Sequence, residues 1–330
     1  MDQALNLKGT YVVYSDIQGS FDYVDRFFKA TQHMRKNGML CLGDIVHRFA
    51  DFSDNRCIEA VKKNTDYCVR GNHENKISKK SQQKITPENL EYVSHLPCVK
   101  DLGNVVLFHS SVRSEGIRLR SKRQIQEEGE YIRNKYPLAR FALFGHTHRK
   151  GAHVIRKDGV HSLEGDEMQV NPEELTLVNP GGIGLWYGLE KTFARINFSS
   201  GRLNFFTLEQ AEEMSYKADI VNAFDARWMP GLNVDSYPWF LQYVKNDAPF
   251  LREKGKEDKR VGQLAARLTS FDRPLFEKVG SPRKKEYLER YSLELAGDVQ
   301  QVRNEVREFY NTEDPFESRK EYLDLKRKKY

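Results

Sequence analysis

The chain has few cysteines, no long apolar run and no concentration of charge in one part. Its four cysteines among 330 residues show no paired spacing. This argues against a disulfide framework or a thiolate zinc site and favours a reducing, cytoplasmic location. No apolar run approaches the roughly 20 residues of a membrane span. The first ten residues lack the basic and apolar regions of a signal peptide, so none is expected.

The net charge of +6 is spread evenly along the sequence. Residues 1–215 contain 30 basic and 27 acidic residues, and the remainder contains 23 and 20, so each part carries +3. A nucleic-acid-binding surface needs its basic groups gathered on one face. The even distribution therefore argues against a nucleic-acid partner.

Apolar strand-like runs alternate with helical patterns up to about residue 212. The segment 151–208 is rich in strand patterns, with a hairpin turn predicted at 199–202. After residue 212, prolines divide the sequence into short helical segments. We therefore expect an α/β domain over 1–212 and a helical extension of unknown role over 213–330. The first expected strands are 10–15, 38–42, 66–69, 104–110 and 141–147, and a helix is expected near 121–136.

The stretch YVVYSDIQGS places Asp16 and Gln18 directly after the first apolar run. Because strand side chains alternate, these two are expected to leave the strand on the same side. A turn capped by Asp16 would explain the same pattern without any ligand. The other strand ends decide between these interpretations.

Polar side chains follow four further apolar runs, where ligands of α/β sheets usually bind. They are Asp44 after the second run, Asn72 and His73 after the third, His109 in the fourth, and His146 and His148 in the fifth. Mixed carboxylate, amide and imidazole donors suit Mn, Fe, Zn or Co better than calcium or structural zinc. The pattern predicts a divalent metal site.

The five stretches SDIQ, GDIVHR, GNHE, FHS and GHTH resemble, in order and spacing, the motifs of the calcineurin-like metallophosphoesterase family. The resemblance covers roughly residues 10–208. It implies an α/β fold of two mixed β-sheets packed face to face and flanked by helices. It also implies hydrolysis of a phosphomonoester or phosphodiester with two divalent metals about 3.5–4 Å apart.

The resemblance assigns roles to individual positions. Asp16, Asp44 and His148 would hold the first metal, and Asp44 would bridge to the second, which Asn72, His109 and His146 would also hold. His73 would contact the phosphate and protonate the leaving oxygen. Arg48, and less strongly Arg70, match phosphate-gripping positions of the phosphoprotein phosphatase branch, but His47 departs from that branch.

Gln18 stands where the family usually has a histidine ligand. A glutamine can ligate through a neutral, hard amide oxygen, which favours Mn over Zn at the first metal. Alternatively, Gln18 only hydrogen-bonds nearby backbone while another residue, such as His47, completes the shell. The sequence leaves both interpretations open.

The substrate cannot be identified from the sequence. The short loops between motifs favour a small phosphate compound or a nucleotide. A phosphoprotein is the second choice, since VRGNHE and Arg48 resemble the serine/threonine phosphoprotein phosphatases. A nuclease is the third, and a non-catalytic scaffold with a degraded metal site is the alternative from another class. A protein partner could bind through residues 213–330.

Overall fold

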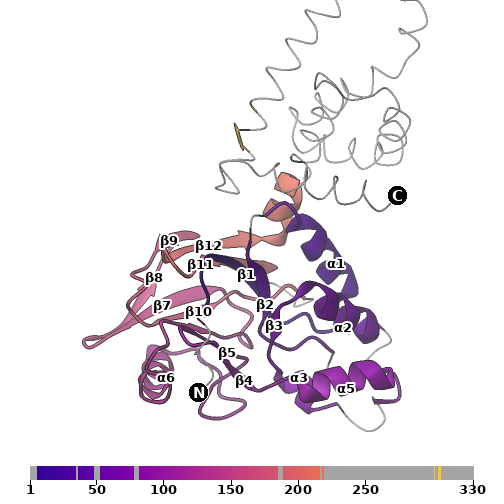
Figure 1. Ribbon diagram of the computed structural model, residues 1–330, viewed down its shortest axis with the longest axis horizontal. Coiled ribbons are helices and arrows are strands. Elements are labelled where there is room, and N and C mark those ends of the chain that lie inside the picture. The colour runs from indigo at the N-terminus through magenta and orange to yellow at the C-terminus, as the bar shows by residue number, and fades with distance from the viewer. Residues whose placement is uncertain are drawn as a thin grey trace, which may run out of the picture. The chain divides into compact units, whose positions relative to one another are not determined.

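The computed structural model describes residues 6–34, 36–47, 53–77, 82–184, 189–215, 218, 301 and 304–305. The chain divides into two units, one of residues 1–32 and 36–212 and the other of residues 33–35 and 213–330. All the named helices and strands belong to the first unit (Figure 1). Most of the expected helical extension lies outside the described residues, so the domain boundary after residue 212 stays a prediction.

The first sheet has six strands in the order β3-β2-β1-β11-β12-β9. β1 pairs with β2 in parallel and with β11 antiparallel, so the sheet is mixed. The bounds are β1 Thr10–Tyr14, β2 Gly38–Cys41, β3 Tyr67–Cys68, β9 Glu167–Gln169, β11 Thr192–Asn197 and β12 Arg202–Thr207.

The second sheet has the order β4-β5-β6-β10-β7-β8 and is also mixed. β5, β6 and β10 run parallel to one another, while β4 and β7 are antiparallel to their neighbours. The bounds are β4 Val99–Asp101, β5 Val105–Phe108, β6 Phe141–Leu143, β7 Gly151–Arg156, β8 Gly159–Leu163 and β10 Thr176–Asn179.

Five helices connect these strands. They are α1 Phe21–Ala30, α2 Ser53–Asn64, α3 Asn72–Asn75, α5 Pro87–His95 and α6 Lys122–Lys135. α6 begins with a capping box, in which Ser121 accepts the backbone N–H of Gln124 and the Gln124 side chain accepts the N–H of Ser121. α5 begins with Thr86 as its cap and Pro87 in its first turn.

The core lies between the two sheets, whose inner faces are both apolar. Val13 and Leu40 from the first sheet, with Leu42 just after β2, belong to one cluster with Leu107 and Leu143 from the second sheet, all without exposed surface. The helices cover the outer faces, with α1, α2 and α5 on one side and α6 on the other (Figure 1). Two mixed sheets flanked by helices confirm the expected fold class, and this packing fixes the strand ends that carry the candidate ligands.

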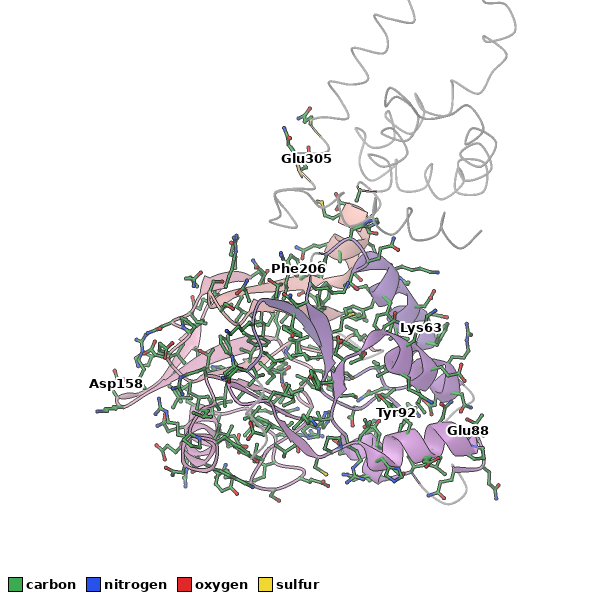
Figure 2. All side chains as sticks on the ribbon, in the orientation of Figure 1. Lys63, Glu88, Tyr92, Asp158, Phe206 and Glu305 are labelled. Carbon is green, nitrogen blue, oxygen red and sulfur yellow. The ribbon has the colours of Figure 1, made fainter. Side chains whose placement is uncertain are left out.

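Most strand expectations are confirmed, and the hairpin turn at 199–202 lies between β11 and β12 as expected. The sequence LEQAEEMSYKADIVNAF predicts a helix over residues 208–224, and the structure has helix over residues 208–215, with most of the remainder outside the described residues. Sequence reasoning did not single out α2, α5 or the short strand β4. Within the part of the chain that the structure describes, no helix is long and apolar enough to cross a membrane. Figure 2 shows the side chains that fill the layers.

Candidate metal centre

The loops after β1 and β2 lie side by side because those strands are parallel neighbours. The backbone N–H of Asp16 donates to the carbonyl of Gly43 at 3.0 Å, and that of Gln18 donates to the carbonyl of Asp44 at 2.8 Å. β1 ends at Tyr14, so strand alternation does not extend to Asp16 and Gln18. Their neighbourhood arises from the turn instead, which corrects the reason given by sequence alone.

Left-handed backbone is concentrated at this edge of the sheets. Among the described residues, five non-glycine residues have positive φ, between 50° and 67°, and all five are candidate ligands: Asp16, Gln18, Asp44, His146 and His148. Such conformations are uncommon outside glycine and cluster at functional sites. These candidate ligands therefore lie on strained turns that follow the strands.

Asp44, His109 and His146 form the most compact group of candidate ligands. One ligand atom from each lies within 4.8 Å of the others. The Nε2 of His109 is 3.3 Å from Oδ2 of Asp44, and its Nδ1 hydrogen-bonds the carbonyl of Leu42 at 2.7 Å. Three of the predicted second-metal residues are thus brought together.

The charges in this group depend on one another. Burial by itself disfavours both charged forms, but the pair stabilises them. Asp44 raises the pKa of the His109 imidazole to about 10, and His109 with His73 lowers the pKa of Asp44 below its ordinary value. Burial and the His109 charge lower the pKa of His146 to about 4. A divalent cation would compete with the His109 proton, so binding it would release that proton.

Asp16, His148 and Gln18 form a neighbouring group. The Nε2 of His148 is 3.4 Å from Oδ1 of Asp16 and 3.2 Å from Nε2 of Gln18. Asp16 also accepts the backbone N–H of His146 through Oδ2 at 3.0 Å. Burial raises the pKa of Asp16. The side-chain amide of Gln18 therefore contacts the imidazole of His148, which is a predicted ligand of the first metal.

Three buried atoms of the candidate ligands make no hydrogen bond within the described residues: Oδ1 of Asp16, Oδ1 of Asn72 and Nε2 of His109, of which the first and last have only the longer contacts given above. Buried polar atoms without partners are costly and rare in native proteins. All three atoms are of the kind that a divalent metal accepts as ligands. The donor set and its unpaired atoms therefore fit the metals that the resemblance implies.

His73 lies beside Asp44 at the start of α3. Its backbone N–H donates to Oδ1 of Asp44 at 2.8 Å, and its ring Nδ1 is 3.1 Å from the carbonyl of Val46. The Nε2 atom is 3.7 Å from Oδ2 of Asp44, and 15% of the side chain is exposed. The imidazole thus contacts both the site and solvent, as a group that meets substrate must.

The glycines that open the motifs GNHE and GHTH are explained by close packing. A Cβ atom on Gly71 would lie 2.2 Å from Oδ1 of Asp44, and one on Gly145 would lie 2.0 Å from Oγ of Ser15. Neither neighbour can retreat, because both belong to the buried loops that carry the candidate ligands. Glycine lets these loops approach one another.

Glu74 is a residue of the site that sequence reasoning missed, although it ends the motif GNHE. Its buried carboxylate accepts backbone N–H groups from Asp44 at 3.0 Å, Val46 at 3.0 Å and Gly71 at 2.7 Å. Burial, and then the charge of Asp44, raises the pKa of Glu74. It joins the loop of Asp44 to the loop of Asn72 and His73.

Replacing Glu74 by glutamine is expected to loosen both loops. The amide keeps the size of the side chain but offers one acceptor oxygen where three N–H groups need partners. We expect a loss of about 1.5–3 kcal/mol in the free energy of unfolding, the usual range for hydrogen bonds to a charged group. Chemical denaturation measures it, with Glu88→Gln on the exposed side of α5 as control. Equal stability of both variants would contradict this role.

Asn179 on β10 lies in the stretch VNPGG (178–182), which resembles the segment after the last metal motif in the family, although sequence reasoning assigned no role to Asn179 itself. Its buried amide donates to the carbonyl of Gly145 at 2.7 Å and lies 3.0 Å from Oγ1 of Thr147. Its carbonyl accepts the N–H of Gly181 at 2.9 Å. Asn179 thus fixes the loop that carries His146 and His148.

Of the two predicted phosphate-gripping arginines, the structure describes only Arg70. Arg48 lies outside the described residues. The guanidinium of Arg70 donates to the carbonyl of Ser94 and to the thiol of Cys98, each at 3.1 Å. The backbone N–H of His47 donates to the buried Asp54 at 2.9 Å. The grip by Arg48 therefore stays a prediction.

The chain is similar to known phosphoesterases. The calcineurin-like phosphoesterase family model matches residues 9–150. A metallophosphoesterase from Sphaerobacter thermophilus has a similar structure, with a TM-score of 0.51 and 20% identity over 60% of this chain and 87% of that chain. The E. coli phosphoesterase Yfce gives a TM-score of 0.34 at 16% identity, over 60% of this chain and 99% of its own. No curated protein sequence matches the chain.

The likeness to the Sphaerobacter protein supports the fold, and the family model supports the motifs. The matched residues include all five motifs and begin one residue before β1. The fifth motif, GHTH, ends two residues before the match does. Residues 9–150 therefore match the calcineurin-like phosphoesterase family, which confirms the resemblance that the five motifs predict.

Proposed function

We propose that this chain is a metal-dependent hydrolase of phosphoric esters, acting on a small phosphate compound or a nucleotide. The observation that carries the proposal is a set of buried ligand atoms on Asp16, Asn72 and His109 that make no hydrogen bond within the described residues. These residues follow or end neighbouring strands. In an ordinary turn, buried polar side-chain atoms are hydrogen-bonded. The match to a phosphoesterase family supports the same reaction.

In this proposal two divalent metals occupy the centre, with manganese favoured. Asp16, Asp44, His148 and Gln18 hold the first, and Asp44, Asn72, His109 and His146 hold the second. The metals would lower the pKa of a bound water and stabilise charge on phosphorus-bound oxygens. His73 contacts the phosphate and carries a proton to the leaving oxygen, and Arg48 grips the phosphate. Glu74 keeps the loops of Asp44 and His73 in register.

The function is tested with purified protein and added Mn²⁺. A generic aryl phosphate and an aryl phosphodiester report the reaction, and elemental analysis reports bound metal. A panel of phosphorylated metabolites, nucleotides and phosphopeptides then identifies the substrate class. Turnover of at least one ester is expected. No turnover of either ester with metal bound would favour the scaffold alternative.

The two metal sites are expected to differ in affinity because of Gln18. Within the described residues, only Asp44, His109 and His146 form a tight group of three carboxylate or imidazole ligands. Asp16, Asp44 and His148 of the first site do not form such a tight group, and Gln18 stands where the family usually has a further histidine, with its amide 3.2 Å from His148. An amide oxygen is a weaker donor than an imidazole for most divalent transition metals.

A metal titration of the wild type and Gln18→His checks this expectation. We expect two unequal affinities in the wild type and a first site that binds roughly 10-fold tighter or more in the variant, comparable to other changes around metal sites. Gln83→His, at an exposed position, serves as control. Equal affinities in all three proteins would show that Gln18 does not lie at the metal.

A further inference from the structure

Residues 110–120 connect β5 to α6 and run past the candidate metal centre. Glu128, fully buried in α6, anchors the start of this loop. Its carboxylate accepts the hydroxyl of Ser111 at 2.6 Å, the N–H of Val112 at 2.5 Å and Nε–H of Arg113 at 3.0 Å. A buried carboxylate with three donors fixes the backbone around it.

The middle of the loop is tied to the helix that carries Asn72 and His73. Glu115 accepts the side-chain amide of Asn75, in the last position of α3, at 2.8 Å and the thiol of Cys98 at 3.1 Å. The N–H of Gly116 donates to the hydroxyl of Ser110 at 3.1 Å. The loop is therefore held in place by the protein's own contacts.

Arg118 is carried by this fixed loop to the edge of the centre. Its Nε–H donates to Nε2 of His146 at 3.3 Å, while the residue remains exposed. Arg113 in the same loop and Arg123 in α6 are paired with Glu127 or Glu128. Among the described residues, Arg118 has no such acidic partner. A positive charge that has no ion-pair partner in the described part of the chain thus lies beside a candidate ligand.

We propose that Arg118 binds the phosphate of the substrate and makes the site prefer a phosphomonoester to a phosphodiester. The proposal rests on the proposed function. A guanidinium presents parallel N–H donors that match phosphate oxygens. If Nε2 of His146 ligated a metal, it would have no lone pair left to accept the hydrogen bond from Arg118. The guanidinium would then be available to donate to another acceptor, such as a phosphate oxygen.

The preference follows from charge. A phosphomonoester carries about −1.5 to −2 at pH 7, because its second pKa is about 6. A phosphodiester carries one negative charge and has two of its four oxygens blocked by carbon. The electrostatic attraction of the Arg118 guanidinium is stronger for the more highly charged phosphomonoester. Arg118 therefore selects for a terminal phosphate, which is the distinction that the motifs leave open.

The test uses the full-length, Mn²⁺-loaded protein and the variants Arg118→Ala and Arg118→Lys. Arg120→Ala is the matched control, because Arg120 is an exposed arginine of the same loop, two residues after Arg118. Calorimetry measures the affinity for inorganic phosphate. Steady-state kinetics gives kcat/KM for nitrophenyl phosphate and for bis-nitrophenyl phosphate.

Arg118→Ala is expected to weaken phosphate binding and lower kcat/KM for the monoester roughly 10- to 100-fold, and to lower the diester value less than about 5-fold. Lysine should restore part of the loss, and the control should match the wild type. Unchanged phosphate affinity in Arg118→Ala, or equal losses on both esters, would overturn the proposal. A failure of the proposed function differs, since the wild type would then turn over neither ester, and phosphate calorimetry would still decide the role of Arg118.

Discussion

Replacing Asp44 by asparagine is expected to remove at least one metal and nearly all turnover while the fold survives. Asp44 is the proposed bridge, and its carboxylate is within 3.3 Å of His109 and 3.7 Å of His73. Asparagine keeps the shape and can still accept the backbone N–H of His73. It removes the one anion shared by two cations, which would then repel each other at short range.

The expected loss in kcat is at least about 1,000-fold, since even one group that stabilises the transition state is worth 10²–10³. Elemental analysis counts the metals, and circular dichroism checks the fold. Asp158→Asn is the matched control, because Asp158 lies exposed at the tip of the β7–β8 hairpin (Figure 2). Full activity with two metals in Asp44→Asn would refute the bridging assignment.

Replacing His73 by alanine is expected to separate metal binding from chemistry. His73 is not a proposed ligand, so the metal content should stay at the wild-type level. If the imidazole protonates the leaving oxygen, the rate should fall by roughly 100- to 10,000-fold on a substrate with a poor leaving group. The loss should be much smaller with nitrophenol, which departs without a proton.

A comparison of leaving groups distinguishes proton transfer from phosphate positioning. Phenyl phosphate and nitrophenyl phosphate differ mainly in the basicity of the departing oxygen, and both are assayed with the wild type and the variant. His161→Ala, on the exposed β7–β8 hairpin, controls for the loss of an imidazole. Equal losses on both esters would leave His73 with positioning alone.

The strands that position this site could be predicted from the sequence, because the sequence pattern that marks each strand and its end is local. An apolar run that stops at a polar ligand-type residue marks both a strand and its end, and five such runs in family order sufficed for the fold class. α2 and α5 were harder to recognise. α2 buries only a narrow stripe, Asp54, Cys57, Ile58 and Val61, between charged residues. Its signal in the sequence is correspondingly weak.

The roles of Glu74 and Asn179, which hold the loops of the candidate ligands in place, could not be predicted, because their hydrogen-bond partners are distant in the chain. Glu74 serves Asp44, thirty residues earlier, and Asn179 serves Gly145, thirty-four residues earlier. Nothing in the sequence distinguishes Arg118 from other surface arginines, and only the structure shows that it lies beside His146. Burial and hydrogen bonding decide these roles, and neither follows from periodicity or motif spacing.

The left-handed turns that carry the candidate ligands set a limit on how stable this domain can be. Each of the five residues occupies a conformation that glycine adopts freely and other residues adopt at a cost of about 1–2 kcal/mol, somewhat less for aspartate. A glycine at such a turn would relieve the backbone and abolish the ligand. Stability alone would therefore favour glycine at these turns, whereas the proposed metal centre needs the side chains that they carry. Designers who seek a more robust variant should leave these five turns untouched and look for gains in the outer helices.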